Sequence, residues 1–494
     1  MTRSRSVTGV TQIALLGTVA ALLSVATGYG VSRLGDGSVR AAPHWILLAL
    51  LATGSTAALI WAVRREELMT PIGLTALVVL VYFVVRPLQL SLETDQLLHA
   101  PYNVFATPLQ SVRDLGAQEI TLFTSTRMTG SLDAALTRAL AALALFFGVL
   151  LIGYRSGVGR RLAVGVSRLG RTMEEIDVSW VVAAWLLVGL GGEAIIFARI
   201  GGVGSAVNQL GTQGNLAVSF IYLVILNFYT VGLLLWMCYR TPESASGKLL
   251  LGAAVAEFVL FLALLGSRTL VVVPILLLLV AWNELRQPLR LRVLVPAAVL
   301  AVLFAAAYLG VREDQHARSL SQVVSAAPRY AVDVATILNS SPVFDQLLEE
   351  TNYVPASAGY RHGGELAQGI LGQVPRFVYP GKPEATDITF RKLIWGDRFL
   401  AGRPVGAAGE VYRDFGFPGI AFGGLLVGVL ARMLTGLRVR SGPPEGRRFR
   451  ALLFVVGMLL LYQFLVGSYS LVLGSALEIA IPLLLALGLF ARRT

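Results

Sequence analysis

The sequence has few of the residues that build most redox, metal and nucleotide sites. Its only cysteine, Cys238, lies inside an apolar run, which excludes disulfides and cysteine-based metal sites. The chain contains no GxxxxGK[ST], no HExxH and no Cys/His cluster, so nothing supports ATP hydrolysis or zinc chemistry. We therefore expect neither a metal nor a cofactor.

Charged residues are also scarce. Only 14% of the 494 residues are charged, 55% are hydrophobic, and the apolar residues come in runs of about 20. A soluble core could not bury this much apolar surface. We expect an all-α polytopic membrane protein with about twelve transmembrane helices, near residues 10–31, 44–63, 69–91, 132–154, 178–198, 217–238, 249–266, 269–284, 293–311, 418–437, 451–469 and 472–491.

The net charge of +12 does not indicate a nucleic-acid partner, because the Lys and Arg residues follow the expected topology. They gather in alternate short loops such as 155–171 and 432–450 and are sparse in the other short loops. Short cytoplasmic loops of membrane proteins carry this excess. The pattern predicts that both termini are cytoplasmic and that the two long loops are external.

The predicted division follows the chain. Residues 1–311 would form nine transmembrane helices with a long external loop at about 92–131, and residues 418–494 would form the last three. Between them, 312–417 would be a large external loop, too rich in apolar and aromatic residues to be disordered. Long loops of this kind are usually functional, so we expect the active site there.

One helix is predicted within that loop. Leu366, Ile370, Leu371 and Val374 repeat at helical spacing, and the pattern stops at Pro375.

The segment "VPRFVYPGKP", residues 374–383, carries two cations, Arg376 and Lys382. Pro380-Gly381 suits the centre of a type II turn, which would let both cations converge on one anion. A structural corner with two solvated cations fits the same spacing.

Arg268 lies between two short apolar runs and is expected at the external tip of a helical hairpin. There it could snorkel to the membrane surface or hold a phosphate through two parallel hydrogen bonds.

The segment "GEVYRDFGFPG", residues 409–419, places charges next to an apolar run. Glu410, Arg413 and Asp414 would share one face of a helical turn. Gly416 disfavours helix, whereas Pro418 suits the first position of a new one, whose free N–H groups could face an anion. The carboxylates could deprotonate an acceptor hydroxyl, or Glu410 and Arg413 could simply anchor the helix.

In the helix that begins at Pro418, glycines at small-xxx-small spacing predict close packing against a neighbour: Gly419, Gly423, Gly424 and Gly428.

The order of "GSRT", then "YRHGGELAQGILGQVPRFVYPGKP", then "GEVYRDFGFPG" resembles the Wzy-type oligosaccharide repeat-unit (O-antigen) polymerases. The resemblance implies a GT-C-like glycosyltransferase at the outer face of the cytoplasmic membrane. It would join undecaprenyl-diphosphate-linked repeat units into a surface polysaccharide without a cofactor. Its partners would be the lipid-linked donor and acceptor glycans, membrane lipids, a flippase and a chain-length regulator.

The resemblance also implies residue roles. The matched positions are Arg268, Arg376, Lys382, Glu410, Tyr412, Phe415, Gly416 and Gly419. The acceptor-activating base would be one of two carboxylates, Glu410 or Asp414. The substrate diphosphate would be bound by Arg268, Arg376, Lys382 and Arg413. Further substrate contacts would come from Tyr412, Arg361 and His362, with structural roles for Gly416, Pro418 and Gly419.

Two alternatives stay open. An O-antigen ligase, or another lipid-carrier-dependent glycosyltransferase, would share the donor and differ in the acceptor. A transporter or flippase would use the carboxylates within apolar runs, Glu193, Glu257 and Glu478. No internal repeat relates the two halves, and the large external loop is hard to explain in a transporter.

Overall fold

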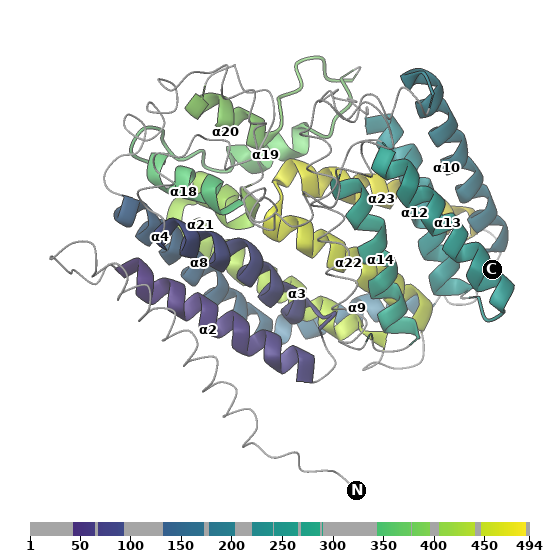
Figure 1. The fold of residues 1–494 in the computed structure, drawn as a ribbon, viewed down its shortest axis with the longest axis horizontal. Coiled ribbons are helices and arrows are strands. Elements are labelled where there is room, and N and C mark those ends of the chain that lie inside the picture. Colours follow the sequence, from purple (N-terminus) through teal and green to yellow (C-terminus); the bar gives the residue numbers. More distant parts are fainter. Residues whose placement is uncertain are drawn as a thin grey trace, which may run out of the picture. The chain divides into compact units, whose positions relative to one another are not determined.

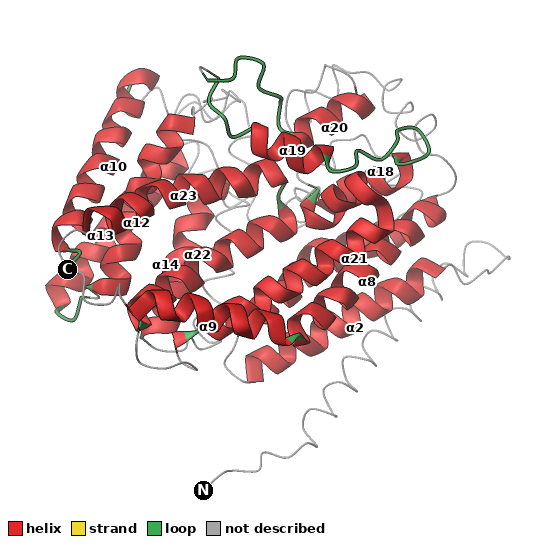
Figure 2. Cartoon of the chain, turned by 180° about the vertical axis from the view of Figure 1, so that it is seen from behind, coloured by secondary structure: helices red, strands yellow, loops and turns green. Residues whose placement is uncertain are grey.

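The protein is an α-helical, multi-pass membrane protein in the part that its computed structural model describes (Figures 1 and 2). The described residues are 43–64, 68–92, 132–171, 177–202, 220–240, 242–264, 268–286, 289, 343–376, 378–395, 405–439 and 446–490. All regular elements among them are helices, and 8 of these helices are long and apolar enough to cross a membrane.

Most predicted transmembrane runs coincide with observed helices. The exceptions, 10–31 and 293–311, lie outside the described residues, as does most of 92–131. The observed helices are α2 (Pro43–Arg64), α3 (Pro71–Val78), the π-helix η1 (Val79–Val84), α4 (Val85–Leu92), α8 (Leu132–Arg155), α9 (Gly157–Arg171), α10 (Ser179–Ile200), α12 (Phe220–Tyr239), α13 (Ala245–Leu264), α14 (Arg268–Leu285), α18 (Val343–Tyr353), α19 (Gly364–Leu371), α20 (Thr386–Trp395), α21 (Gly406–Leu437), α22 (Arg447–Val466) and α23 (Tyr469–Phe490).

The chain forms two compact units, each assembled from separate stretches of sequence. The first comprises Met1–Ser156, Leu338–Arg432 and Leu461–Val472, and the second comprises Gly157–Ile337, Met433–Leu460 and Leu473–Thr494. These units do not coincide with the three consecutive segments predicted from the sequence. That division stays a prediction.

In the first unit, α21 packs closely against α8 through its glycines. A Cβ at Gly424 would lie 2.4 Å from the carbonyl oxygen of Phe146, and one at Gly428 would lie 2.0 Å from that of Leu150. Because neither position has room for a side chain, the close packing predicted from the glycine spacing is confirmed.

Several segments of the first unit meet at the end where α4 finishes and where α21 and α23 begin. Arg86 in α4 forms a buried ion pair with Asp345 at the start of α18 (3.0 Å). The carboxylate of Glu410 in α21 accepts a hydrogen bond from the main-chain N–H of Tyr469 in α23. α18 is almost wholly buried and packs against α8. The described part of the predicted 312–417 loop, which carries most of the predicted site residues, is therefore fixed to the ends of membrane-spanning helices.

The second unit is held by close helix contacts and a few polar ones. Gly189 in α10 faces the Tyr229 side chain of α12, where a Cβ would come within 2.5 Å of it. The indole N–H of Trp185 donates to the carbonyl oxygen of Pro482 in α23 (3.0 Å). α9 was not predicted, because its 15 residues are too short for a membrane-spanning run and include four arginines.

The topology can be tested by thiol labelling in a Cys238→Ala background. Ser357→Cys should react with an impermeant reagent in intact cells, whereas Leu162→Cys should not, because the connection at 155–171, which contains α9, is rich in cations. Both side chains are exposed in the structure, so burial would not explain a difference. Labelling at 162 and not at 357 would reverse the orientation.

Candidate functional site

The site is built around an interruption in α21. Gly416 adopts φ 64° and ψ −147°, a region open essentially only to glycine, and the proline two residues later has no N–H. The carbonyl groups of Arg413 and Asp414 therefore lack helical partners. They accept hydrogen bonds from the main-chain N–H groups of Arg361 and His362, at 3.0 and 2.9 Å. The predicted break is confirmed, and it ties the 361–362 segment to α21.

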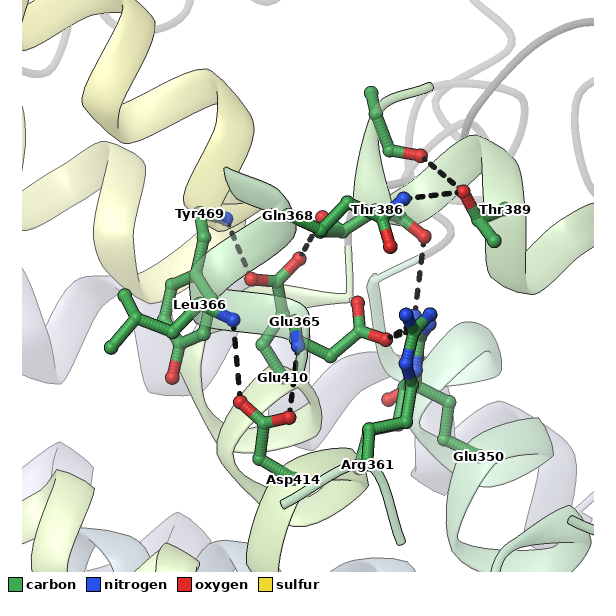
Figure 3. A network of polar contacts seen from close by, with 12 residues as sticks. Glu350, Arg361, Glu365, Leu366, Gln368, Thr386, Thr389, Glu410, Asp414 and Tyr469 are labelled. Carbon is green, nitrogen blue, oxygen red and sulfur yellow. Dashed lines mark hydrogen bonds and ion pairs between the residues drawn. The ribbon is translucent and has the colours of Figure 1, made fainter. Parts of the chain in front are cut away.

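Arg413 is the centre of a buried polar network. Figure 3 shows its partners Glu350, Glu365 and Thr386. Its Nη1 donates to Glu350 Oε1 and to the carbonyl oxygen of Thr386, both at 3.3 Å. Its Nη2 donates to Glu365 Oε1 at 2.5 Å, and Arg361 Nη1 lies 2.9 Å from the same oxygen. One carboxylate thus holds two guanidinium groups side by side.

Glu410 is fully buried, and both of its carboxylate oxygens are in use. Thr386 Oγ1 donates to Oε1 at 2.6 Å, and the main-chain N–H of Tyr469 donates to Oε2 at 2.7 Å. The side chain therefore joins α20 and α23 to α21. Its predicted role as the base stays a prediction, since the side chain is fully buried and does not line the pocket described below.

Asp414 caps α19 from another helix. Its two oxygens accept from the main-chain N–H groups of Glu365 (2.9 Å) and Leu366 (3.4 Å). The N-cap residue itself, Gly363, has no side chain to do this. A carboxylate at a helix N-terminus both satisfies free donors and complements the helix dipole.

Two further carboxyl groups of the network are only half paired. Oε2 of Glu350 and Oε2 of Glu365 are buried without a hydrogen-bond partner among the described residues. Burial raises the pKa of Glu350 well above its ordinary value of 4.5; the Arg413 guanidinium opposes this, and the carboxylates of Glu365 and Glu410 add to it. Burial also raises the pKa of Glu365, against the lowering effect of Arg413 and Arg361.

A pocket of about 470 Å³ lies beside this network. It is lined by Val354, Ala358, Gly359, Arg361, Thr389, Phe390, Lys392 and Arg413. The side chains of Arg361 and Lys392 are 39% and 24% exposed, whereas that of Arg413 is 3% exposed and lies over the Phe390 ring at 4.4 Å. No carboxylate is among the described residues that line it, although Glu365 pairs with both arginines and Glu384 pairs with Lys392 (2.7 Å). The cations in its wall make the pocket suited to an anion.

The remaining predicted contacts fall in three places. Tyr412 is buried, and its hydroxyl donates to the carbonyl oxygen of Val354 at 3.1 Å, so it serves the packing of the site. His362 is exposed and contributes its main-chain N–H. Arg268 begins α14 in the second unit, and its side chain lies outside the described residues.

Arg376 is close enough to Lys382 to affect its charge, but their convergence on one anion stays a prediction. The N–H of Lys382 donates to the carbonyl oxygen of Tyr379 (3.1 Å), which closes the expected turn. The predicted turn type was wrong. A type II turn requires a positive φ at its third residue, and Gly381 is not among the described glycines with positive φ. Burial and then the neighbouring Arg376 lower the pKa of Lys382. Neither cation lines the pocket.

Sequence reasoning missed Glu350, Glu365, Phe390 and Lys392. One signal was present in "VFDQLLEETNY", where acidic residues interrupt an apolar helical pattern in a segment taken as loop. No group of three or more His, Cys, Asp or Glu among the described residues is arranged to hold a metal ion.

The two buried carboxylates of α21 should respond differently to amide substitution. Asp414→Asn would turn an NH₂ group toward an N–H donor and should lower the free energy of unfolding by about 1–3 kcal/mol. Glu410→Gln can still accept from Tyr469 and donate to the Thr386 hydroxyl, so no buried donor is left facing another, and we expect a loss below about 1 kcal/mol. Thermal unfolding of the purified variants would check this, and an equal or larger loss in Glu410→Gln would contradict it.

Glu350 should make stability depend on pH. Because the pKa of Glu350 is raised in the folded state, the folded protein binds more protons than the unfolded chain at pH values above 4.5. The free energy of unfolding should therefore fall as pH rises. Each unit of the shift corresponds to about 1.4 kcal/mol. Between about pH 5 and about pH 8, the unfolding temperature of Glu350→Gln should therefore fall less than that of the wild type. Glu243→Gln, which removes an exposed carboxylate outside the network, is the matched control. If both variants follow the wild type, Glu350 does not carry this effect.

Comparison with known proteins adds no relative. No family model, no curated protein and no solved structure matches the chain. The resemblance to the repeat-unit polymerases therefore rests on the three quoted motifs, and the function has to be proposed from the chemistry of the site.

Proposed function

We propose that the chain is a lipid-carrier-dependent glycosyltransferase that joins undecaprenyl-diphosphate-linked repeat units into a surface polysaccharide. The observation that carries the proposal is the cationic pocket beside the interrupted helix α21, with Arg361, Lys392 and Arg413 in its wall. The reaction would take place at the outer face of the cytoplasmic membrane. The charge distribution of the loops supports that orientation.

The pocket matches what such a reaction needs from a protein. The bond between the anomeric carbon of the glycan and the diphosphate breaks while a bond to the oxygen of an acceptor hydroxyl forms. The hydroxyl proton would pass to a base, which the resemblance implies is Glu410 or Asp414, and negative charge develops on the leaving diphosphate. Fixed cations stabilise that charge without having to reorganise. Arg361 and Lys392 are exposed enough to contact the diphosphate, and Arg413 adds its charge from behind.

Glu365 is a positioning residue in this proposal. Its Oε1 bonds both Arg361 and Arg413, and α19 holds it in place because Asp414 caps that helix. Two guanidinium groups would otherwise repel each other, and the carboxylate between them keeps both at the pocket.

A transporter is the second candidate, and one feature of the second unit favours it. Glu193 in α10 is buried with its Oε1 unpartnered among the described residues, and Glu257 in α13 accepts a hydrogen bond from Tyr229 (2.9 Å). Carboxylates within membrane spans often carry protons or substrates.

The decisive experiment is to incubate purified protein with the undecaprenyl-diphosphate-linked repeat unit. A ladder of longer lipid-linked glycans supports a polymerase. Transfer of the glycan only to a different acceptor lipid would indicate a ligase. Movement of the lipid across a vesicle membrane without any new product would support the transporter.

Substitutions can test the pocket in the same ladder assay. Arg361→Lys keeps the charge but cannot bond Glu365 and a diphosphate through one planar group, and it should lower the rate about 100-fold. Lys392→Gln should also slow the reaction. Arg376→Lys, at a cation outside the pocket, is the matched control and should stay close to wild type. Full activity of Arg361→Lys with loss in Arg376→Lys would move the anion site to the 376–382 turn.

A further inference from the structure

Helix α19 has its two faces reversed relative to a helix on the surface of a soluble protein. Its apolar residues Leu366, Ile370 and Leu371 are 46%, 53% and 44% exposed. Its polar residues Glu365 and Gln368 are 0% and 7% exposed. A surface helix in water turns its apolar residues inward and its polar residues outward.

The polar face of α19 cannot turn outward, because its groups are bonded inside the protein. Gln368 Nε2 donates to the carbonyl oxygen of Glu384 (2.8 Å) and to Thr389 Oγ1 (2.6 Å). Glu365 holds the arginines of the site, and Figure 3 shows Leu366 on the side of Glu365 opposite to Arg361. The outward direction of the apolar residues is therefore a fixed property of the fold.

Both ends of α19 rest on helices that are long and apolar enough to cross a membrane. At its start, a Cβ at Gly363 would lie 3.6 Å from the ring of Phe415 in α21. Just beyond its end, Gln373 Nε2 donates to the carbonyl oxygen of Ser470 in the first turn of α23 (2.9 Å). The helix is about 12 Å long and joins these two points, so it lies across the ends of α21 and α23.

The exposed apolar residues of α19 continue onto α21. Phe415 and Phe417 are exposed where this helix is interrupted, and Phe422 is exposed within its membrane-spanning part. We call Leu366, Ile370, Leu371, Phe415 and Phe417 the apolar surface. A patch of this kind on a water-exposed face would favour aggregation, whereas at a membrane boundary it is stabilised by lipid.

We propose that the apolar surface lies in the bilayer, at the boundary between headgroups and acyl chains, and that the occupant of this surface is membrane lipid. This placement of α19 puts Arg361 at headgroup depth, because Arg361 precedes the helix by three residues and bonds Glu365 in its first turn. An anionic headgroup could then reach the cationic pocket from the side without leaving the membrane. The membrane contact itself does not depend on the proposed transferase activity.

The test measures the depth of single labelled positions in the full chain, reconstituted in lipid nanodiscs. In a Cys238→Ala background, Ile370→Cys and Leu366→Cys would carry a fluorophore, and Ser357→Cys in an exposed turn would be the control. We expect brominated lipid to quench the labels at 366 and 370 several times more than the label at 357. Aqueous iodide should show the reverse order.

Two outcomes would overturn the proposal. Strong quenching by iodide alone at 366 and 370 would place the surface in water. Weak quenching by both agents would mean that protein covers it, either another segment of this chain or a second copy. Because quenching needs no catalysis, lipid contact in a protein that forms no ladder would reject the transferase and keep the membrane placement.

Discussion

The burial of one guanidinium group, that of Arg413, determines how the candidate site is assembled. A charge inside a protein costs several kcal/mol unless it is paired and hydrogen-bonded. The partners of Arg413 come from three separate helices: Glu350 from α18, Glu365 from α19 and the Thr386 carbonyl from α20. Each helix therefore supplies a hydrogen-bond partner that the buried guanidinium needs. This explains why a segment without long apolar runs packs so firmly against α21.

The interruption of α21 supplies the second constraint. A regular helix would bond its own carbonyl groups, but the conformation of Gly416 and the following proline leave two of them free. The 361–362 segment fills both positions, which brings Arg361 next to Arg413 and places α19 where Asp414 can cap it. Two sequence features of α21, a glycine and a proline, thus set the geometry of a pocket formed mainly by other segments.

The sequence predicted the features that depend on nearby residues. Apolar run length gave the helices, glycine spacing gave the contact of α21 with α8, and the 416–418 break was visible because glycine and proline act locally. The buried network could not be found in this way, because its members are far apart in the chain: Glu350 and Arg413 are separated by 63 residues and Arg86 and Asp345 by 259. An acidic residue in a loop looks solvated until the cation that it meets in the fold is known.

Helix α19 shows why a helix can be predicted from its spacing while its orientation stays undetermined; the predicted end was also wrong, because the helix stops at Leu371 and Val374 lies beyond it. The spacing of Leu366, Ile370 and Leu371 identifies one apolar face, and in a soluble protein that face would be buried. What decides the orientation is the carboxylate of Asp414, 48 residues beyond Leu366, together with the arginines that need Glu365. Once the polar face is committed to that network, the apolar face must point away from the protein. A chain that also crosses the bilayer offers lipid as the medium in which such a face is stable.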